Sequence, residues 1–269
     1  MKHLIIGKGE IGTGIYDVLS PYYHVRTYDS NIKLDSDNRM PEGLFDVLHI
    51  CIPGGLKNFV DIVSNYILNY QPKLVIVHST VPVGTCTNIL IATRNHPMSP
   101  HFSIVHSPVR GKHPHMRKGL SVYTKYIGYC DSRGKLLTEQ IYEQAGLKFR
   151  SLPECETTEL GKILSTTDYG VNLMWAKIKN DLCRDLELDY ADVVGDFTET
   201  YNDGVRDLGC IQYTKQELTP PSDKVGGHCV IENSYLLTNQ FNDNENLNEL
   251  MSLLIRLGKG DRKLDGYDE

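Results

Sequence analysis

A glycine-rich turn near the start of the chain constrains the fold more than any other stretch of the sequence. An apolar run, Leu4–Ile6, ends at Gly7, and glycines follow with the spacing G-x-G-x-x-G at Gly9 and Gly12. Apolar residues then recur at helical intervals, so the segment predicts a strand, a tight turn and a helix. The first glycine permits the turn, the second lets backbone N–H groups approach a pyrophosphate, and the third lets helix and strand pack closely.

A second strand is predicted at His24–Tyr28 and ends at Asp29, about 20 residues past the glycines. A carboxylate there accepts hydrogen bonds from an adenosine ribose and repels a 2′-phosphate, which favours NAD over NADP. Arg26 is the one nearby residue that argues for a phosphate, and a turn that has lost its ligand is the alternative to binding. The residues assigned to the cofactor are Gly7, Gly9, Glu10, Ile11, Gly12, Asp29, Ile52, Pro53, Ser79 and Thr80.

Composition narrows the classes of partner. The 269 residues are 40% hydrophobic and 23% charged with a formal net charge of −6, which gives no electrostatic case for nucleic acid or an anionic membrane. No apolar run approaches the about 20 residues of a membrane span, and no signal-peptide pattern is seen. We therefore expect a cytoplasmic protein with a small-molecule ligand. Seven cysteines without C-x-x-C spacing indicate neither a disulfide framework nor a zinc finger.

The alternation of strands and helices predicts an α/β fold, with a Rossmann-type doubly wound parallel sheet over residues 1–150. Further strands are expected at Asp46–Cys51, Lys73–His78, Phe102–His106, Tyr123–Tyr129 and Leu147–Arg150. Helices are expected at Leu56–Ile67, Asn88–Ala92 and Lys135–Ala145.

The spacing of apolar residues along the chain changes at residue 151. The run S-L-P-E at 151–154 has capping-box spacing, and apolar residues from Leu160 to Leu186 follow at intervals of mostly three and four. They predict a connecting helix of about 30 residues, roughly 45 Å long, and the polar stretch Asp189–Asp207 predicts one or two more helices. The expected division is an NAD-binding domain at 1–150, a smaller all-helical dimerisation and catalytic domain at 151–258, and a charged tail at 259–269. Because so long a helix exceeds what a small domain covers, we expect a homodimer.

Three further motifs follow in order along the chain. The run S-T-V-P-V-G-T at 79–85 lies just past a predicted strand, at the edge where open α/β sheets bind ligands. The run E-T-T-E-L-G-K at 156–162 opens the long helix, and Thr166 lies one turn past Lys162. In the run G-G-H-C at 226–229, paired glycines let the backbone approach a ligand and present the thiol of Cys229. A small buried residue is the commoner role of such a cysteine.

With the N-terminal turn, these motifs resemble the UDP-glucose/GDP-mannose dehydrogenase family over residues 1 to about 240. The resemblance implies that Thr80 lines the active site, Lys162 is a catalytic lysine and Cys229 is the nucleophile. It also implies an enzyme that oxidises a sugar-nucleotide primary alcohol twice with two NAD. A thiolate that adds to an aldehyde lets a second hydride leave, and an ammonium stabilises the developing oxyanion. The expected substrate contacts are Arg110, Lys112, Gly226, Gly227 and His228.

The chain departs from the family pattern in three ways. Val109 stands where the family has a glutamate after Ser-Pro, and valine cannot act as an acid or base. Thr166 and Asn233 replace a family asparagine and aspartate, so their hydrogen bonds can persist in the catalytic set while one charge is lost. About 40 residues follow Cys229, fewer than the family's C-terminal nucleotide-sugar domain requires. We therefore expect a smaller substrate, or a nucleotide held by a partner subunit.

Histidines offer a rival site. His96, His101, His106, His113 and His115 fall within 20 residues, and three imidazoles can bind zinc. No acidic ligand lies nearby in the sequence, and we expect no metal. Contact with an anionic substrate, or substitution for the missing glutamate, is the favoured role for this segment.

The leading hypothesis is an NAD-dependent oxidoreductase that acts on a CH–OH group of a sugar or sugar nucleotide, with a two-step oxidation through a thioester on Cys229. One alternative is a single-step, two-electron dehydrogenase in which Cys229 is structural. Another is a non-catalytic NAD-binding protein that kept the fold.

Overall fold

The computed structural model describes residues 1–31, 33–34, 39–94, 96–111 and 116–259. These divide into two units, Met1–Lys162 and Ile163–Glu269, and each is described by itself. The strands of the first unit are β1 (Lys2–Ile6), β2 (His24–Tyr28), β3 (Val47–Ile50), β4 (Leu74–Val77), β5 (Ser103–His106), β6 (Lys125–Tyr129) and β7 (Phe149–Pro153). Its helices are α1 (Glu10–Leu19), α2 (Phe59–Tyr70), α3 (Thr85–Arg94), α4 (Met116–Val122), α5 (Ser132–Gln144) and the start of α6 (Cys155–Asp185).

The strands form one sheet in the order β2-β1-β3-β4-β5-β6-β7. Neighbouring strands are parallel except β5 and β6, which are antiparallel. The Rossmann-type fold class with a mostly parallel sheet is confirmed, and the β5–β6 pair is the antiparallel exception. An antiparallel neighbour begins at the edge where β5 ends, so the connection does not cross the sheet. That connection contains α4, which packs against α1 and was not predicted because its seven residues show no clear apolar stripe.

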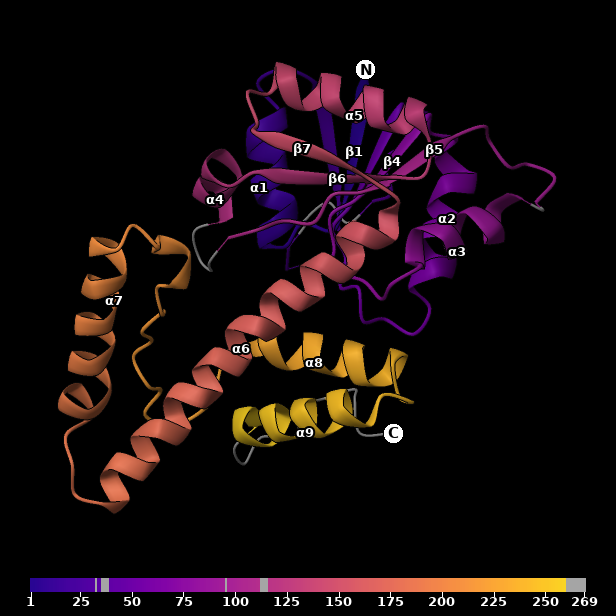
Figure 1. The fold of residues 1–269 in the computed structure, drawn as a ribbon. Helices are drawn as coiled ribbons and strands as arrows, with labels where there is room; N and C mark the ends of the chain where they lie inside the picture. The colour runs from indigo at the N-terminus through magenta and orange to yellow at the C-terminus, as the bar shows by residue number, and fades with distance from the viewer. Residues whose placement is uncertain (32, 35–38, 95, 112–115, 260–269) are drawn as a thin grey trace. The chain divides into compact units, whose positions relative to one another are not determined.

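Two apolar clusters lie on opposite faces of the sheet. Leu4 and Ile6 of β1 belong to the cluster under α2 and α3, whereas Ile5 belongs to the cluster under α1, α4 and α5. This alternation follows from the two-residue period of a strand. Figure 1 shows the same layers, with α5 on one side of the sheet and α2 and α3 on the other. The helices cover both faces, so ligand access is left to the edges.

Helix α6 has 31 residues, which confirms the expected length of about 30. The predicted capping box at 151–154 is wrong. Ser151 and Pro153 lie in β7, paired with β6, and the Ser151 hydroxyl donates to Glu139 Oε1 at 2.6 Å. Glu154 takes a positive φ of 65° that ends the strand, and the helix begins one residue later.

The second unit contains the remainder of α6, α7 (Phe197–Asp207), α8 (His228–Gln240) and α9 (Glu245–Lys259). A π-helical segment, Ala191–Asp196, precedes α7, so helix in the polar stretch at 189–207 is confirmed. Helix α8 packs against α9, and a Cβ at Gly170 of α6 would meet Val230 and Leu254 of these two helices. Among the residues that the structure describes, no helix is both long enough and apolar enough to cross a membrane. The predicted charged tail lies outside the described residues from position 260 onward.

Candidate active site

The glycine turn joins β1 to α1 in the predicted conformation. Gly7 has a φ of +97°, and a Cβ there would lie 2.7 Å from the backbone of Cys51. A Cβ at Gly12 would overlap the carbonyl oxygen of Gly7, whereas a Cβ at Gly9 would meet nothing within 4 Å. Gly9 is the N-cap of α1 and has no side chain to occupy the first-turn amides, which include those of Ile11 and its neighbours. The first and third glycines therefore maintain the turn, and the second leaves space in front of it.

The Asp29 carboxylate is hydrogen-bonded to the backbone of this turn. Its Oδ2 accepts a hydrogen bond from the amide of Lys8 at 2.7 Å, and its Oδ1 accepts one from Asn31 at 2.8 Å. The amide of Gly7 donates to the carbonyl of Tyr28, so the end of β2 is held against the turn. A carboxylate offers about four acceptor positions, and two remain for the hydroxyls of a ribose.

A hollow of about 360 Å³ adjoins the turn between α1 and the edge strand β2. Its walls include Lys8, Thr13 and Tyr16 on one side and Arg26, Thr27 and Arg39 on the other. Three cationic residues, Lys8, Arg26 and Arg39, therefore line one hollow beside the turn, and they are the feature of this edge that would favour a phosphate.

The loops after β3 and β4 touch at the same edge of the sheet. A Cβ at Gly54 would overlap the carbonyl oxygen of Thr80, and the hydroxyl of Ser79 donates to the carbonyl of Ile52 at 2.5 Å. Glycine is thus required beside Pro53 for the two loops to approach. The predicted cofactor residues Ile52, Pro53, Ser79 and Thr80 come together in this way.

Two glutamates at the start of α6 hold the 79–87 segment, a contact that sequence reasoning missed. Glu159 is fully buried and accepts from the amides of Gly84 at 2.6 Å and Cys86 at 3.0 Å. Glu156 accepts from the hydroxyl of Thr87 at 2.6 Å. Burial raises the pKa of the Glu159 carboxyl, and the backbone hydrogen bonds oppose that rise. The E-x-x-E spacing of the second motif therefore positions the loop of the first motif.

His106 joins the same assembly. Its Nε2 lies 3.1 Å from the carbonyl oxygen of Ser79 and its Nδ1 lies 2.8 Å from the hydroxyl of Thr158. Because a carbonyl only accepts, Nε2 carries the proton and Nδ1 accepts from Thr158. Burial lowers the pKa of His106 to about 3, so the ring is neutral. Both nitrogens are occupied, which leaves this histidine unsuited to metal ligation.

The structure describes two of the other four histidines of the proposed cluster. His96 and His101 are exposed, and His113 and His115 lie outside the described residues, as does Lys112. No group of three or more His, Cys, Asp or Glu residues in the described part of the chain could hold a metal ion.

Val109 and Arg110 follow β5. Val109 is buried within the apolar cluster under α1, α4 and α5, so its position belongs to the core. The guanidinium of Arg110 lies 5.5 Å from the ring centroid of Tyr126 and 5.9 Å from that of Tyr123. These distances are within the range of a cation–π contact, which holds the base of the loop that precedes Lys112.

The expected catalytic residues divide between the two units. Thr80 and Lys162 lie in the first, and Thr166, Cys229 and Asn233 lie in the second. Lys162 and Thr166 are one turn apart on α6.

In the second unit, Gly226 has a φ of +74° and Gly227 is the N-cap of α8. Cys229 is the second residue of the helix and is exposed, and Asn233 is buried one turn later. His228 Nε2 lies 2.9 Å from Glu232 Oε1 on the same helix. A thiol in the first turn lies at the positive end of the helix dipole, which favours negative charge.

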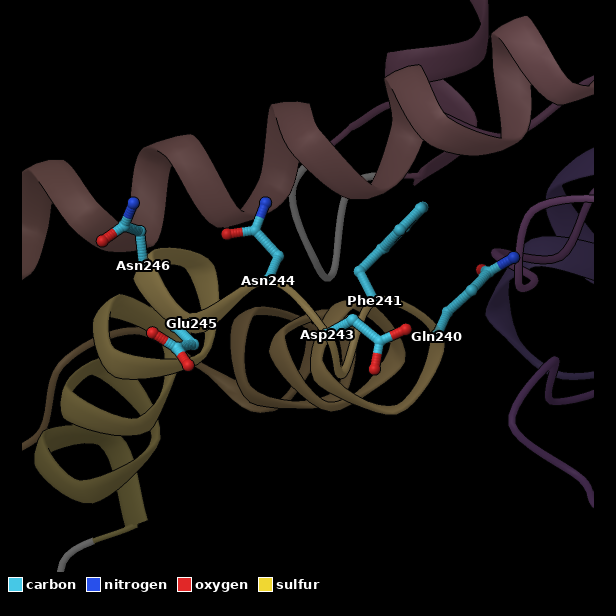
Figure 2. A pocket seen from close by; sticks show the side chains of 6 residues that line it. All are labelled: Gln240, Phe241, Asp243, Asn244, Glu245 and Asn246. Carbon is cyan, nitrogen blue, oxygen red and sulfur yellow. The ribbon is translucent and has the colours of Figure 1, made fainter.

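A second hollow, of about 580 Å³, lies at the turn between α8 and α9, at the opposite end of α8 from Cys229. Figure 2 shows Asn244 and Asn246 on one side of this turn and Asp243 and Glu245 on the other. These polar groups do not converge, and the hollow contains none of the predicted site residues.

Comparison with solved structures places this fold among dehydrogenases. Similar structures include a UDP-D-ManNAc dehydrogenase from Pyrococcus horikoshii, with a TM-score of 0.77 and 19% identity over 96% of this chain and 69% of that one. A UDP-glucose dehydrogenase from Pyrobaculum islandicum gives 0.72 and 15% over 95% and 67%. A 3-hydroxyisobutyrate dehydrogenase from Mycobacterium tuberculosis, in a structure with L-serine, gives 0.68 and 14% over 94% and 91%.

No protein-family model matches the sequence, and no curated protein matches it. By its likeness to the solved structures, the chain has the fold of the dehydrogenases whose motifs it resembles. It spans about two thirds of the length of the two UDP-sugar enzymes.

Proposed function

We propose that this chain is an NAD-dependent dehydrogenase that oxidises a CH–OH group of a sugar or sugar nucleotide. The observation that carries the proposal is the glycine turn with the Asp29 carboxylate hydrogen-bonded to its backbone, at the ligand-binding edge of a Rossmann-type sheet. In such sheets the dinucleotide lies at the carboxyl ends of the strands. The likeness to two UDP-sugar dehydrogenases supports the substrate class.

In this proposal the residues of the first unit bind NAD and prepare the substrate. The turn at Gly7–Gly12 receives the pyrophosphate, Asp29 accepts from the ribose, and Ser79 and Thr80 line the nicotinamide side. Lys162 stabilises the oxyanion that develops on the substrate. Bound NAD supplies a hydride acceptor.

The second unit supplies the nucleophile in the two-step version. The Cys229 thiolate adds to the aldehyde carbon, and the second oxidation leaves a thioester that water hydrolyses to the acid. Thr166 and Asn233 orient these groups, while Gly226, Gly227 and His228, with Arg110 and Lys112, contact the substrate. Because Val109 is a core residue, hydrolysis has no carboxylate at that position and is slow. A reaction that ends after one hydride is the alternative.

We expect NAD to bind and NADP to bind poorly, because the Asp29 carboxylate would lie against the 2′-phosphate. NAD at about 100 times its dissociation constant should raise the melting temperature by roughly 5–10 °C. A thermal-shift titration with both cofactors, on the wild type and Asp29→Asn, measures this. Removal of the charge should reduce the preference for NAD. If both cofactors raise the melting temperature of the wild type equally, Asp29 does not select against the 2′-phosphate. The hollow lined by Arg26 and Arg39 would then be the place that accepts this phosphate.

We also propose a homodimer formed through α6. Leu164, Trp175 and Leu182 are 46%, 54% and 54% exposed, and their spacing of eleven and seven residues places them on one helix face. Exposed apolar residues that share one helix face are typical of an interface. Light scattering at micromolar concentration should give twice the 30.4 kDa chain mass, and Trp175→Glu should give the monomer. A wild-type monomer would contradict the proposal.

A further inference from the structure

Four buried side chains form a continuous hydrogen-bonded chain across the sheet. His3 Nδ1 lies 2.9 Å from His49 Nε2, His49 Nδ1 lies 3.0 Å from His78 Nε2, and His78 Nδ1 lies 3.1 Å from Lys125 Nζ. None of the four is more than 2% exposed. Neighbouring imidazoles are stacked, with ring centroids 5.2 and 5.3 Å apart.

The strands place these residues in register. His49 pairs with Ile5 and Ile76, so His3 and His78 lie two residues away from it in opposite directions on the neighbouring strands. Side chains at such diagonal positions share a face and come within reach of each other. The four side chains therefore run from the amino-terminal end of β1 to the carboxyl edge of the sheet, on the face that carries the apolar cluster under α1, α4 and α5.

Lys125 ends the chain at the edge where the candidate cofactor site lies. Besides His78, its Nζ donates to the carbonyls of Ser107 at 2.5 Å and Pro108 at 3.3 Å. These carbonyls immediately precede Val109 and Arg110, and His78 immediately precedes Ser79. At the other end, His3 Nε2 is buried and has no hydrogen-bond partner among the described residues.

Both protonation states of Lys125 satisfy the three contacts that link Lys125, His78, His49 and His3. The 3.0 Å contact of His78 Nδ1 with the Ser107 carbonyl is a hydrogen bond only when Nδ1 carries the proton. As an ammonium, Lys125 donates three times, and His78, His49 and His3 each accept at Nδ1 and donate from Nε2. As a neutral amine, Lys125 donates to the two carbonyls and accepts from His78, and each histidine then carries its proton on Nδ1. The difference is one proton, present on His3 Nε2 in the first state and absent in the second.

We propose that Lys125, His78, His49 and His3 form a proton relay. Through it, the Lys125 amine gains or loses a proton that enters or leaves at His3, at the amino-terminal end of β1. The ammonium gives a proton to His78 Nδ1, His78 passes its Nε2 proton to His49, and His49 passes its own to His3. Because His3 Nε2 is buried, its proton leaves on a water molecule that enters at the amino-terminal end of β1. The N–H bonds formed and broken balance, and no imidazolium remains.

The groups around the relay favour neutral rings. Burial lowers the pKa of His3 to about 4 and of Lys125 to about 7, and places those of His49 and His78 well below the usual range. The other titratable or charged groups that act on the relay are the N-terminus, Tyr23, Asp46, Cys51, His106, Tyr142 and Lys162.

The consequence for ligand binding rests on the proposed function. Lys125 places a removable positive charge beneath the loops that carry Thr80 and Arg110, and a positive charge there favours an anionic dinucleotide. Binding of NAD should therefore weaken as the pH rises through the Lys125 transition. The tautomer experiment below is independent of any cofactor, so failure of the proposed function would leave it intact.

The test is nitrogen-15 NMR of the imidazoles in the full chain. In the wild type at pH 6, all three relay histidines should carry the proton on Nε2. In Lys125→Met, His78 Nδ1 should instead donate to the Ser107 carbonyl, 3.0 Å away. The proton should then move to Nδ1 in all three rings, including His3, which Lys125 does not contact. Lys135→Met, at a lysine of α5 that pairs with Glu139, is the matched control and should change none of them.

Two further measurements keep the proposal testable if Lys125→Met folds poorly. Raising the pH of the wild type from 6 to 9 should transfer the proton from Nε2 to Nδ1 in all three rings with one shared midpoint. In His49→Leu, the His3 tautomer should no longer respond to pH while that of His78 still does. A change confined to His78, or separate midpoints for the three rings, would overturn the relay.

Discussion

A Gly12→Ala variant is expected to lose more than about 3 kcal/mol of unfolding free energy, or to fail to accumulate as folded protein. The added Cβ would overlap the carbonyl oxygen of Gly7 and also lie 3.3 Å from the Ile5 side chain. The carbonyl is part of a turn whose φ of +97° leaves little freedom to shift. Urea unfolding followed by circular dichroism measures the loss.

Gly9→Ala is the matched control for that variant. A Cβ at Gly9 meets nothing within 4 Å, and a φ of −66° suits alanine, so unfolding should change by less than about 1 kcal/mol. The same Cβ projects into the space assigned to the pyrophosphate, so NAD affinity should fall at least about tenfold. Unchanged NAD affinity in Gly9→Ala, measured by calorimetry, would show that the turn is not the pyrophosphate site.

The protein is expected to lose stability steeply between pH 6.5 and about 4. Burial lowers the pKa of His3 to about 4 and of His106 to about 3, and lowers those of His49 and His78 well below 6.5. As the pH falls through 6.5, the unfolded chain binds protons that the folded chain does not, so unfolding becomes more favourable. Each such histidine contributes about 1.4 kcal/mol per pH unit.

Two carboxyls oppose this loss. The pKa values of Glu159 and Glu232 are raised mainly by burial, so the folded chain gains protons there as the pH falls. The net slope is then about 3 to 4 kcal/mol per pH unit, against the 5–15 kcal/mol that stabilises a typical domain. Urea unfolding at pH 7, 6 and 5 measures the slope. Equal unfolding free energies at pH 7 and 5 would contradict the burial of neutral histidines.

The glycine turn and its acidic partner could be predicted because their cause is local. The positive φ at Gly7 and the close approach at Gly12 are requirements of a short segment, and Asp29 follows a strand that must lie beside β1. The prediction of a capping box was wrong because the sequence S-L-P-E is compatible with a strand end as well as with a helix start. The strand conformation is stabilised by the pairing of β7 with β6, which the local sequence does not encode.

The contacts that were missed join residues far apart in the sequence. Glu159 holds the loop after β4 across 75 residues, and the proposed relay joins His3 of β1, His49 of β3 and His78 just past β4. In the sequence each of those histidines is an isolated polar residue, whereas the five histidines at 96–115 are conspicuous. Those of the five that the structure describes belong to no group that could hold a metal ion. Only the register of β1, β3 and β4 shows which histidines meet.

Dehydrogenase activity is measured by incubating the protein with NAD and a panel of nucleotide sugars and counting the NADH formed per substrate consumed, with Cys229→Ala in parallel. We expect NADH to form with at least one nucleotide sugar. Two NADH per substrate, an acid product and loss of the second oxidation in Cys229→Ala indicate the two-step reaction, and one NADH with Cys229→Ala unaffected indicates the single-step alternative. Tight NAD binding with no NADH from any substrate would contradict the proposed activity and leave a protein that binds the dinucleotide without oxidising a sugar.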